Sequence, residues 1–137
     1  MADLSITAAS VAASLQGDVS TRLAGAAITA GQTVYFDTST NTYKLADSNS
    51  ATAAVRQPAG IALNSAASGQ PVTVKGAGPI TFNAVLTLGV GYYQSATPGG
   101  ICPAADLTTG HYPTFLGFAT STTVLDLDIQ QAGVALG

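Results

Sequence analysis

The chain contains an internal repeat, and this feature restricts its possible folds more than any other. Residues 28–35 (ITAGQTVY) recur 58 positions later as residues 86–93 (LTLGVGYY). The same order continues with the matched segments 46–47 and 105–106, and 60–62 and 117–119. A repeat at a fixed interval indicates one structural unit used twice. Because the repeated positions are turn and aromatic residues, we predict a duplicated β-module with a structural role, divided at about 26–84 and 85–137.

The composition favours strands over helices. Only 8% of the residues are charged, against about 25% in a typical domain, and none of them is glutamate. Small residues such as alanine, serine, threonine and glycine dominate, whereas the strong helix formers glutamate, lysine and arginine are scarce. So few charges leave little electrostatic repulsion between copies. We therefore expect other protein to cover a good part of the surface in the working state.

About ten short strands are predicted, in a single β domain over residues 26–137. The segments with strand character are 32–36, 42–46, 60–64, 71–75, 80–82, 91–95, 100–103, 114–119 and 124–129. In the clean alternation of 71–75, Val72 and Val74 are expected to point inward and Lys75 outward. Turn signals roughly every 8–12 residues are typical of a small barrel or sandwich, so the predicted fold class is all-β.

Residues 1–25 lie outside the repeat and are predicted to form an N-terminal arm. Apolar residues recur at every fourth position, at Val11, Leu15, Val19 and Leu23. This spacing also suits an amphipathic helix, although the β-rich context favours an extended arm. A segment outside the repeat with few apolar anchors is a candidate for docking onto a neighbouring protein.

Several functions are not expected from this composition. The four basic residues are scattered along the chain, at Arg22, Lys44, Arg56 and Lys75. They do not form a phosphate-tracking patch, so nucleic acid is not an expected partner. Cys102 is the single cysteine, which excludes an intramolecular disulfide and a cysteine-cluster metal site. Prolines and glycines interrupt the longest uncharged run, 76–105, so a membrane-spanning helix is not expected. No basic residue precedes Arg22, so a secretory leader is not expected either.

Asp126 and Asp128 are the strongest candidate for a carboxylate pair or a calcium site. They project from one face of a predicted strand, about 7 Å apart at ~3.4 Å per residue. Their face lies opposite the apolar residues Leu125 and Leu127, and no third acidic residue is near in sequence. We therefore interpret them as a solvated outer face.

Two other polar segments resemble functional sites only in part. Residues 37–41 (DTSTN) have the first oxygen ligands of an EF-hand loop, but Thr42 and Ser48 replace its glycine and its bidentate glutamate, so a hairpin turn is predicted. His111, the only histidine, has Asp106 as a possible orienting partner for base catalysis. A loop or interface histidine is the favoured interpretation, and no G-x-S-x-G nucleophile motif accompanies it.

The remaining conspicuous residues are assigned to packing. Cys102 is interpreted as a small buried apolar residue. The glycine pairs in 76–78 and 89–91 lack the helix and lysine of a phosphate-binding loop. Tyr35 and Tyr93 match across the repeat and are expected to pack equivalently at the rim of each half. We predict no enzymatic activity, no cofactor and no metal.

The chain resembles small structural proteins of tailed bacteriophages, and the nearest group is the head decoration, or cement, proteins. The segments that carry the resemblance are 2–9, 28–35, 60–64, 69–74 and 125–129. The resemblance implies a β-barrel or β-tulip-like sandwich that binds the outer surface of the capsid. It also implies self-association, usually as a trimer, and contact with the major capsid protein, which clamps neighbouring capsomers. Such a protein joins the virion in the host cytoplasm, and the family offers no catalytic residues.

The predicted capsid-contacting residues lie in the arm. They are Leu4, Ile6, Val11 and Leu15, chosen because they are isolated from the repeat. Deletion of residues 1–20 is expected to abolish capsid binding and to leave the fold intact. Two alternatives stay open: a tail, fibre or baseplate module, and a carbohydrate-binding or enzymatic β-domain.

Overall fold

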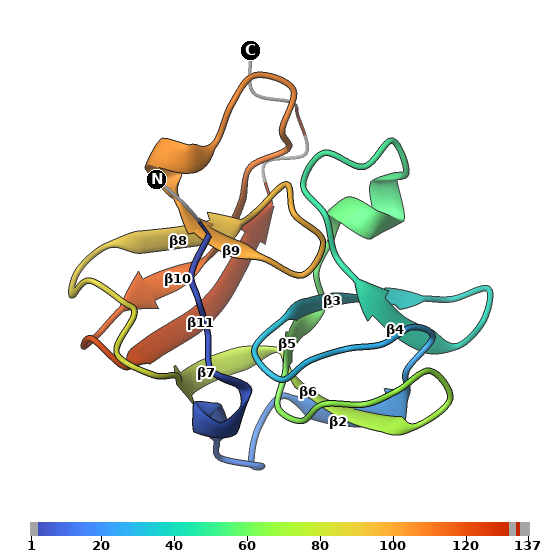
Figure 1. Ribbon diagram of the computed structural model, residues 1–137. Helices are drawn as coiled ribbons and strands as arrows, with labels where there is room; N and C mark the ends of the chain where they lie inside the picture. Colours follow the sequence, from blue (N-terminus) through green and yellow to red (C-terminus); the bar gives the residue numbers. More distant parts are fainter. Residues whose placement is uncertain (1–2, 132–133, 135–137) are drawn as a thin grey trace.

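Two antiparallel β-sheets make up the protein (Figure 1). The computed structural model describes residues 3–131 and 134. The elements in chain order are η1 (Ala8–Ser10), β1 (Ala12–Ala13), β2 (Val19–Leu23), β3 (Thr33–Asp37), β4 (Thr42–Leu45), η2 (Ala53–Arg56), β5 (Gly60–Ala62), β6 (Pro71–Lys75), β7 (Ala77–Thr81), β8 (Gly91–Gln94), β9 (Ile101–Pro103), η3 (Ala104–Asp106), β10 (Thr114–Ala119) and β11 (Val124–Gln131). The all-β prediction is confirmed. Neither sheet closes into a barrel within the described residues, so the architecture is a sandwich.

The two sheets have the same strand order, which confirms the duplicated module. The five-stranded sheet runs β2-β6-β5-β3-β4, and the six-stranded sheet contains β7-β11-β10-β8-β9 with β1 added beside β7. We call residues 19–75 module one and residues 77–131 module two. Figure 1 shows them side by side, with module two on the left and module one on the right.

The register of the strand pairs is also shared. Val34 of module one pairs with Leu45 and Gly60, and Tyr92 of module two pairs with Pro103 and Gly117. In the neighbouring pairs, Ile61 lies opposite Lys75, and Phe118 lies opposite Asp126. Residues at matching strand-pair positions therefore have defined equivalents in the other module. The equivalences used below are Thr33 with Gly91, Tyr35 with Tyr93, Phe36 with Gln94, Ile61 with Phe118, and Lys75 with Asp126.

The module boundaries differ from those expected. Residues 19–23 were placed in the arm, but they form β2, which pairs with β6 along its whole length. Residues 77–81 were placed in the first repeat, but β7 pairs with β11 of module two in the equivalent way. The sequences of β2 (VSTRL) and β7 (AGPIT) share no motif, so the repeat is invisible there. The helical interpretation of the arm is also wrong, because its described part holds one 3₁₀ turn and strand segments.

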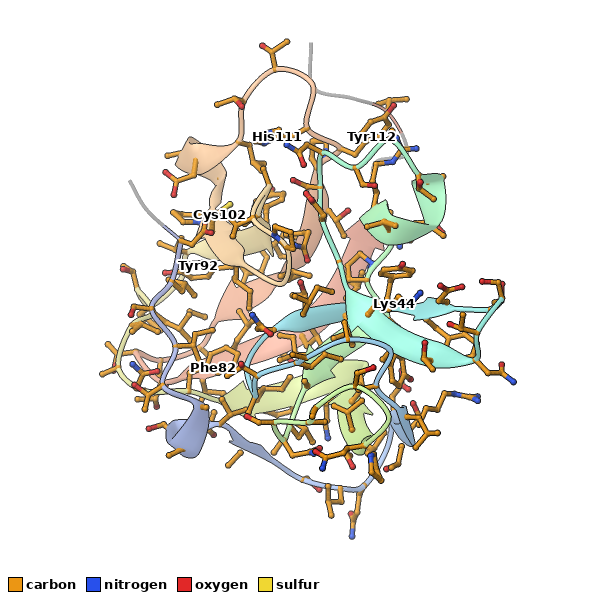
Figure 2. The ribbon with its side chains drawn as sticks, turned by 45° about the vertical axis from the view of Figure 1, so that its right-hand side comes forward. Lys44, Phe82, Tyr92, Cys102, His111 and Tyr112 are labelled. Atoms are coloured by element: carbon orange, nitrogen blue, oxygen red, sulfur yellow. The ribbon has the colours of Figure 1, made fainter. Side chains whose placement is uncertain are left out.

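Each module has its own hydrophobic cluster. In module one, buried residues such as Val34, Tyr43 and Val72 fill the inside of a curled sheet, and Ala24 bridges to Tyr43 at its rim. In module two, Phe82, Tyr92 and Leu125 form the centre of a larger cluster, and Figure 2 shows Phe82 and Tyr92 in this half. Ile61 of module one belongs to this second cluster and is 0% exposed. Full burial of such a side chain contributes roughly 1.5–3 kcal/mol.

The outer face of module one therefore packs against the open side of the module-two cluster, at Gln94, and we call this open side the mouth of module two. The Thr33 hydroxyl, on the face opposite Val34, donates a hydrogen bond to the Gln94 carboxamide oxygen. The Thr33 amide donates to the Gly99 carbonyl at 3.0 Å, and Gln94 Nε2 donates to the Ala46 carbonyl at 3.0 Å. Thr33 and Gln94 are fully buried, and these bonds satisfy their polar groups. The modules are thus joined through the outer face of module one and the mouth of module two, a contact that we call face to mouth. These two surfaces are not equivalent in the repeat.

Candidate functional site

Three of the four predicted capsid-contacting residues lie against the protein's own core. Leu4, Ile6 and Val11 are half-buried on the cluster of module two, whereas Leu15 is 72% exposed. Figure 1 shows the arm crossing in front of the strands of module two. The capsid contact stays a prediction, and Leu15 is the member of this set that is available without rearrangement. Deletion of residues 1–20 would uncover this core and remove β1, so the structure leads us to expect a destabilised fold in place of an intact one.

The arm is held at both ends by polar contacts. The Leu4 amide donates to the Ile101 carbonyl at 2.8 Å, and the Ser95 hydroxyl donates to Asp3 Oδ1 at 2.6 Å. At the other end, Lys75 Nζ donates to the Ser14 carbonyl at 2.8 Å and to a second arm carbonyl at 3.1 Å. Lys75 was expected to point to solvent, but the arm covers it and it is 3% exposed. A buried ammonium needs such acceptors, since leaving it unpaired is costly.

The other candidate residues do not assemble a reactive site. Asp126 and Asp128 are exposed on β11, opposite buried leucines, as the solvated-face interpretation predicted. Among the described residues, no group of three potential metal ligands comes together. Asp37 ends β3 and residues 38–41 connect it to β4, which confirms the hairpin turn. Lys44 Nζ donates to Asp37 Oδ2 at 2.7 Å, and this contact, with hydrogen bonds from Ser39, lowers the pKa of Asp37 well below its usual range.

His111 and Cys102 have local structural partners. Both ring nitrogens of His111 contact Thr108, at 3.3 Å from its amide and 3.2 Å from its hydroxyl. Figure 2 shows His111 in the loop above the sheets and Cys102 below it. Cys102 is 2% exposed, and burial raises the pKa of its thiol to about 12, with smaller effects from Asp3 and Asp106. The thiol therefore stays protonated at neutral pH and is a poor nucleophile.

The outer face of module two carries a cluster of three aromatic residues, which we call the aromatic face: Tyr93 and Phe115, which are half-buried, and the exposed Phe118. The ring centroids of Tyr93 and Phe115 are 5.6 Å apart, and those of Phe115 and Phe118 are 4.9 Å apart. Phe118 is 58% exposed. Gly91 beside it makes room for the rings, because a Cβ there would lie 3.0 Å from Phe115 Cε1. The face thus presents one exposed aromatic ring, Phe118, supported by two half-buried rings.

The equivalent face of module one is covered. Tyr35 and Ile61, which correspond to Tyr93 and Phe118, are 9% and 0% exposed. The mouth of module two covers Ile61, and the arm covers Lys75, the equivalent of Asp126. Within the described residues, Phe118 on the outer face of module two stays largely exposed. Sequence analysis missed this surface because Phe118 and Ile61 both look like ordinary buried strand residues.

Two of the cavities in the described part of the chain lie away from this face. The larger, of about 280 Å³, lies between the arm and the loops at 29–32 and 97–101. The smaller, of about 180 Å³, includes Arg56, whose guanidinium carbon lies 3.5 Å from the centre of the Tyr112 ring. Figure 2 shows Tyr112 near the top of the molecule. Neither cavity gathers several ionisable groups, so the aromatic face is the candidate functional site.

No protein-family model, curated protein or solved structure matches the chain. Within the part of the chain that the structure describes, no helix has the length and apolar character needed to cross a membrane.

Proposed function

We propose that this protein is a viral structural protein of the capsid-decoration type, which binds the outer surface of a phage head and stabilises contacts between capsomers. The observation that carries the proposal is the uncovered aromatic face of module two, whose equivalent in module one is buried. A rigid sheet that presents an ordered apolar face is suited to binding another protein. We therefore expect other protein subunits to cover this face when the protein is assembled.

Two further features support an architectural role. The surface carries few charges, which favours close packing of many copies. The exposed Leu15 lies in the loop that the buried Lys75 ammonium holds in place, so this apolar contact point is presented on a fixed backbone. Many weak contacts of this kind add up through multivalency when a block touches several subunits. The partners proposed are the major capsid protein and further copies of this chain, as a trimer on the virion surface.

The test is binding of the purified protein to heads that lack it, followed by electron microscopy of the particles. We expect density on the outer head shell, and we expect Leu15→Ser to weaken binding about tenfold. Leu88→Ser is the matched control, because Leu88 is also exposed, at 66%, but lies in the loop before β8. Unchanged binding of the Leu15 variant would contradict the arm contact. Density on the tail would support the fibre or baseplate alternative, and no binding would contradict both.

A carbohydrate-binding role is the second candidate, because aromatic rings next to carboxylates are common where sugars stack. Asp126 and Phe118 lie opposite each other on the outer face. The ring planes, however, are inclined by 71° and 62°, so the rings form edge-to-face pairs and not a flat platform. Glycan-array binding that Phe118→Ser abolishes would favour this candidate over the capsid role.

A further inference from the structure

The basic residues of the two modules are confined to module one, which also holds Asp37 and Asp47. All four basic side chains, Arg22, Lys44, Arg56 and Lys75, belong to module one. Module two holds three aspartates and no basic residue, and Asp126 and Asp128 lie on its outer strand β11. Two copies that meet through their module-two faces would bring like charges together. A contact between module two of one copy and module one of the next brings opposite charges together.

The contact inside the chain shows how such a pairing is made. There the outer face of module one, at Thr33 and Ile61, enters the mouth of module two at Gln94. By the shared register, the corresponding outer face of module two is the aromatic face, and the position equivalent to Gln94 is Phe36 of module one.

The rim of module one fits this role. Phe36 is half-buried, and the guanidinium carbon of Arg22 lies 4.5 Å from the centre of its ring. Segment 24–31 and Ala66 already fill the inside of module one, through Ala24, Ile28 and Ala66, so the surface left for a partner is this rim. The rim carries the ring of Phe36 and the cation of Arg22, and the aromatic face carries aromatic rings and the carboxylate of Asp126.

We propose that the aromatic face of module two binds the Arg22–Phe36 rim of module one in a second copy of this chain. The contact is head to tail, with Phe118 against Phe36 and Asp126 facing Arg22. A heterologous contact of this kind closes into a ring when its rotation permits and otherwise extends into a filament. The inference rests on the proposed function, because it names the surface through which further copies of this chain would associate. Its experiment contains no capsids, so failure of self-association and failure of capsid binding through Leu15 are distinguishable.

The experiment measures the mass of the isolated protein by sedimentation velocity over a range of concentrations, without capsids. We expect concentration-dependent association. Phe118→Ser, Asp126→Arg and Arg22→Asp should each raise the dissociation constant about tenfold or more. The double variant Arg22→Asp/Asp126→Arg should regain association, because it restores opposite charges across the contact in every copy.

The controls are Leu88→Ser for the loss of an exposed apolar side chain and Asp47→Arg for the change of charge, and both should stay within about twofold of the parent chain. Circular dichroism melting of each variant checks that the fold is retained. A protein that stays monomeric throughout overturns the proposal. So does a double variant that associates no better than its single parents, or association that Arg22→Asp leaves unchanged.

Discussion

Truncation of two equivalent residues, Ile61→Ala and Phe118→Ala, tests the face-to-mouth packing of the modules. Ile61→Ala removes three fully buried carbons, which is about 2.4 kcal/mol of transfer free energy at ~0.8 kcal/mol per carbon. The cavity left behind adds to this loss, so we expect about 3–4 kcal/mol of destabilisation, inside the range of ~2–5 kcal/mol for such changes.

Phe118→Ala removes a larger side chain but should cost less. Because Phe118 is 58% exposed, only about two-fifths of its side chain is buried, which accounts for roughly 1 kcal/mol. Loss of the edge-to-face contact with Phe115 adds about 0.5 kcal/mol. The expected destabilisation of the monomer is therefore about 1.5 kcal/mol, at most half of that for Ile61→Ala.

The assay is urea unfolding followed by circular dichroism, at a concentration low enough to keep the protein monomeric. The free energy of unfolding is obtained from the midpoint and the slope of the transition. If Phe118→Ala destabilises the monomer as much as Ile61→Ala, the outer face of module two is covered within one chain. That result would refute both the packing argument and the aromatic face as an open surface.

Two further predictions concern the arm and the thiol. In urea unfolding, Gly31→Ala should destabilise the protein clearly more than Gly89→Ala. Both glycines have positive φ, at +94° and +81°, but a Cβ at Gly31 would lie 2.6 Å from Ile6 Cγ2, whereas a Cβ at Gly89 would have nothing within 4 Å. Equal losses of unfolding free energy would contradict the packing of the arm. Cys102 should react with iodoacetamide at pH 8 only on unfolding, and fast labelling of the folded protein would contradict its burial. Because burial raises the pKa of the folded thiol to about 12, the unfolded chain loses this proton first, so the free energy of unfolding should fall as the pH rises from about 9 towards 12. Cys102→Ala should remove that part of the pH dependence.

Most strands could be predicted from local patterns. Segments 71–75 and 114–119 coincide with β6 and β10, because alternation and flanking turn residues specify a strand and its ends locally. Strand β2 was missed, since its residues Val19–Leu23 are almost all exposed and carry no clear alternation. What makes it a strand is the free edge of β6, and that edge exists only after module one has formed.

The candidate site was much less predictable. The sequence pointed to the arm, because apolar residues outside a repeat look unpartnered. In the structure Leu4 and Ile6 have a partner, since module two leaves its own core open to them. The exposed Phe118 and the buried Ile61 occupy equivalent positions with similar local sequence, so no local rule separates them.

The sequence by itself therefore determined the class of fold, the duplication and the turns, because strand periodicity and turn chemistry act over a few residues. The tertiary structure decided which equivalent surfaces are buried. Burial depends on what lies across an interface, and in the described residues the contact between the modules covers Ile61 but not its equivalent, Phe118. In this protein the more exposed of the two equivalent faces is that of module two, with Phe118 exposed on it and Asp126 opposite Phe118 in the strand pairing.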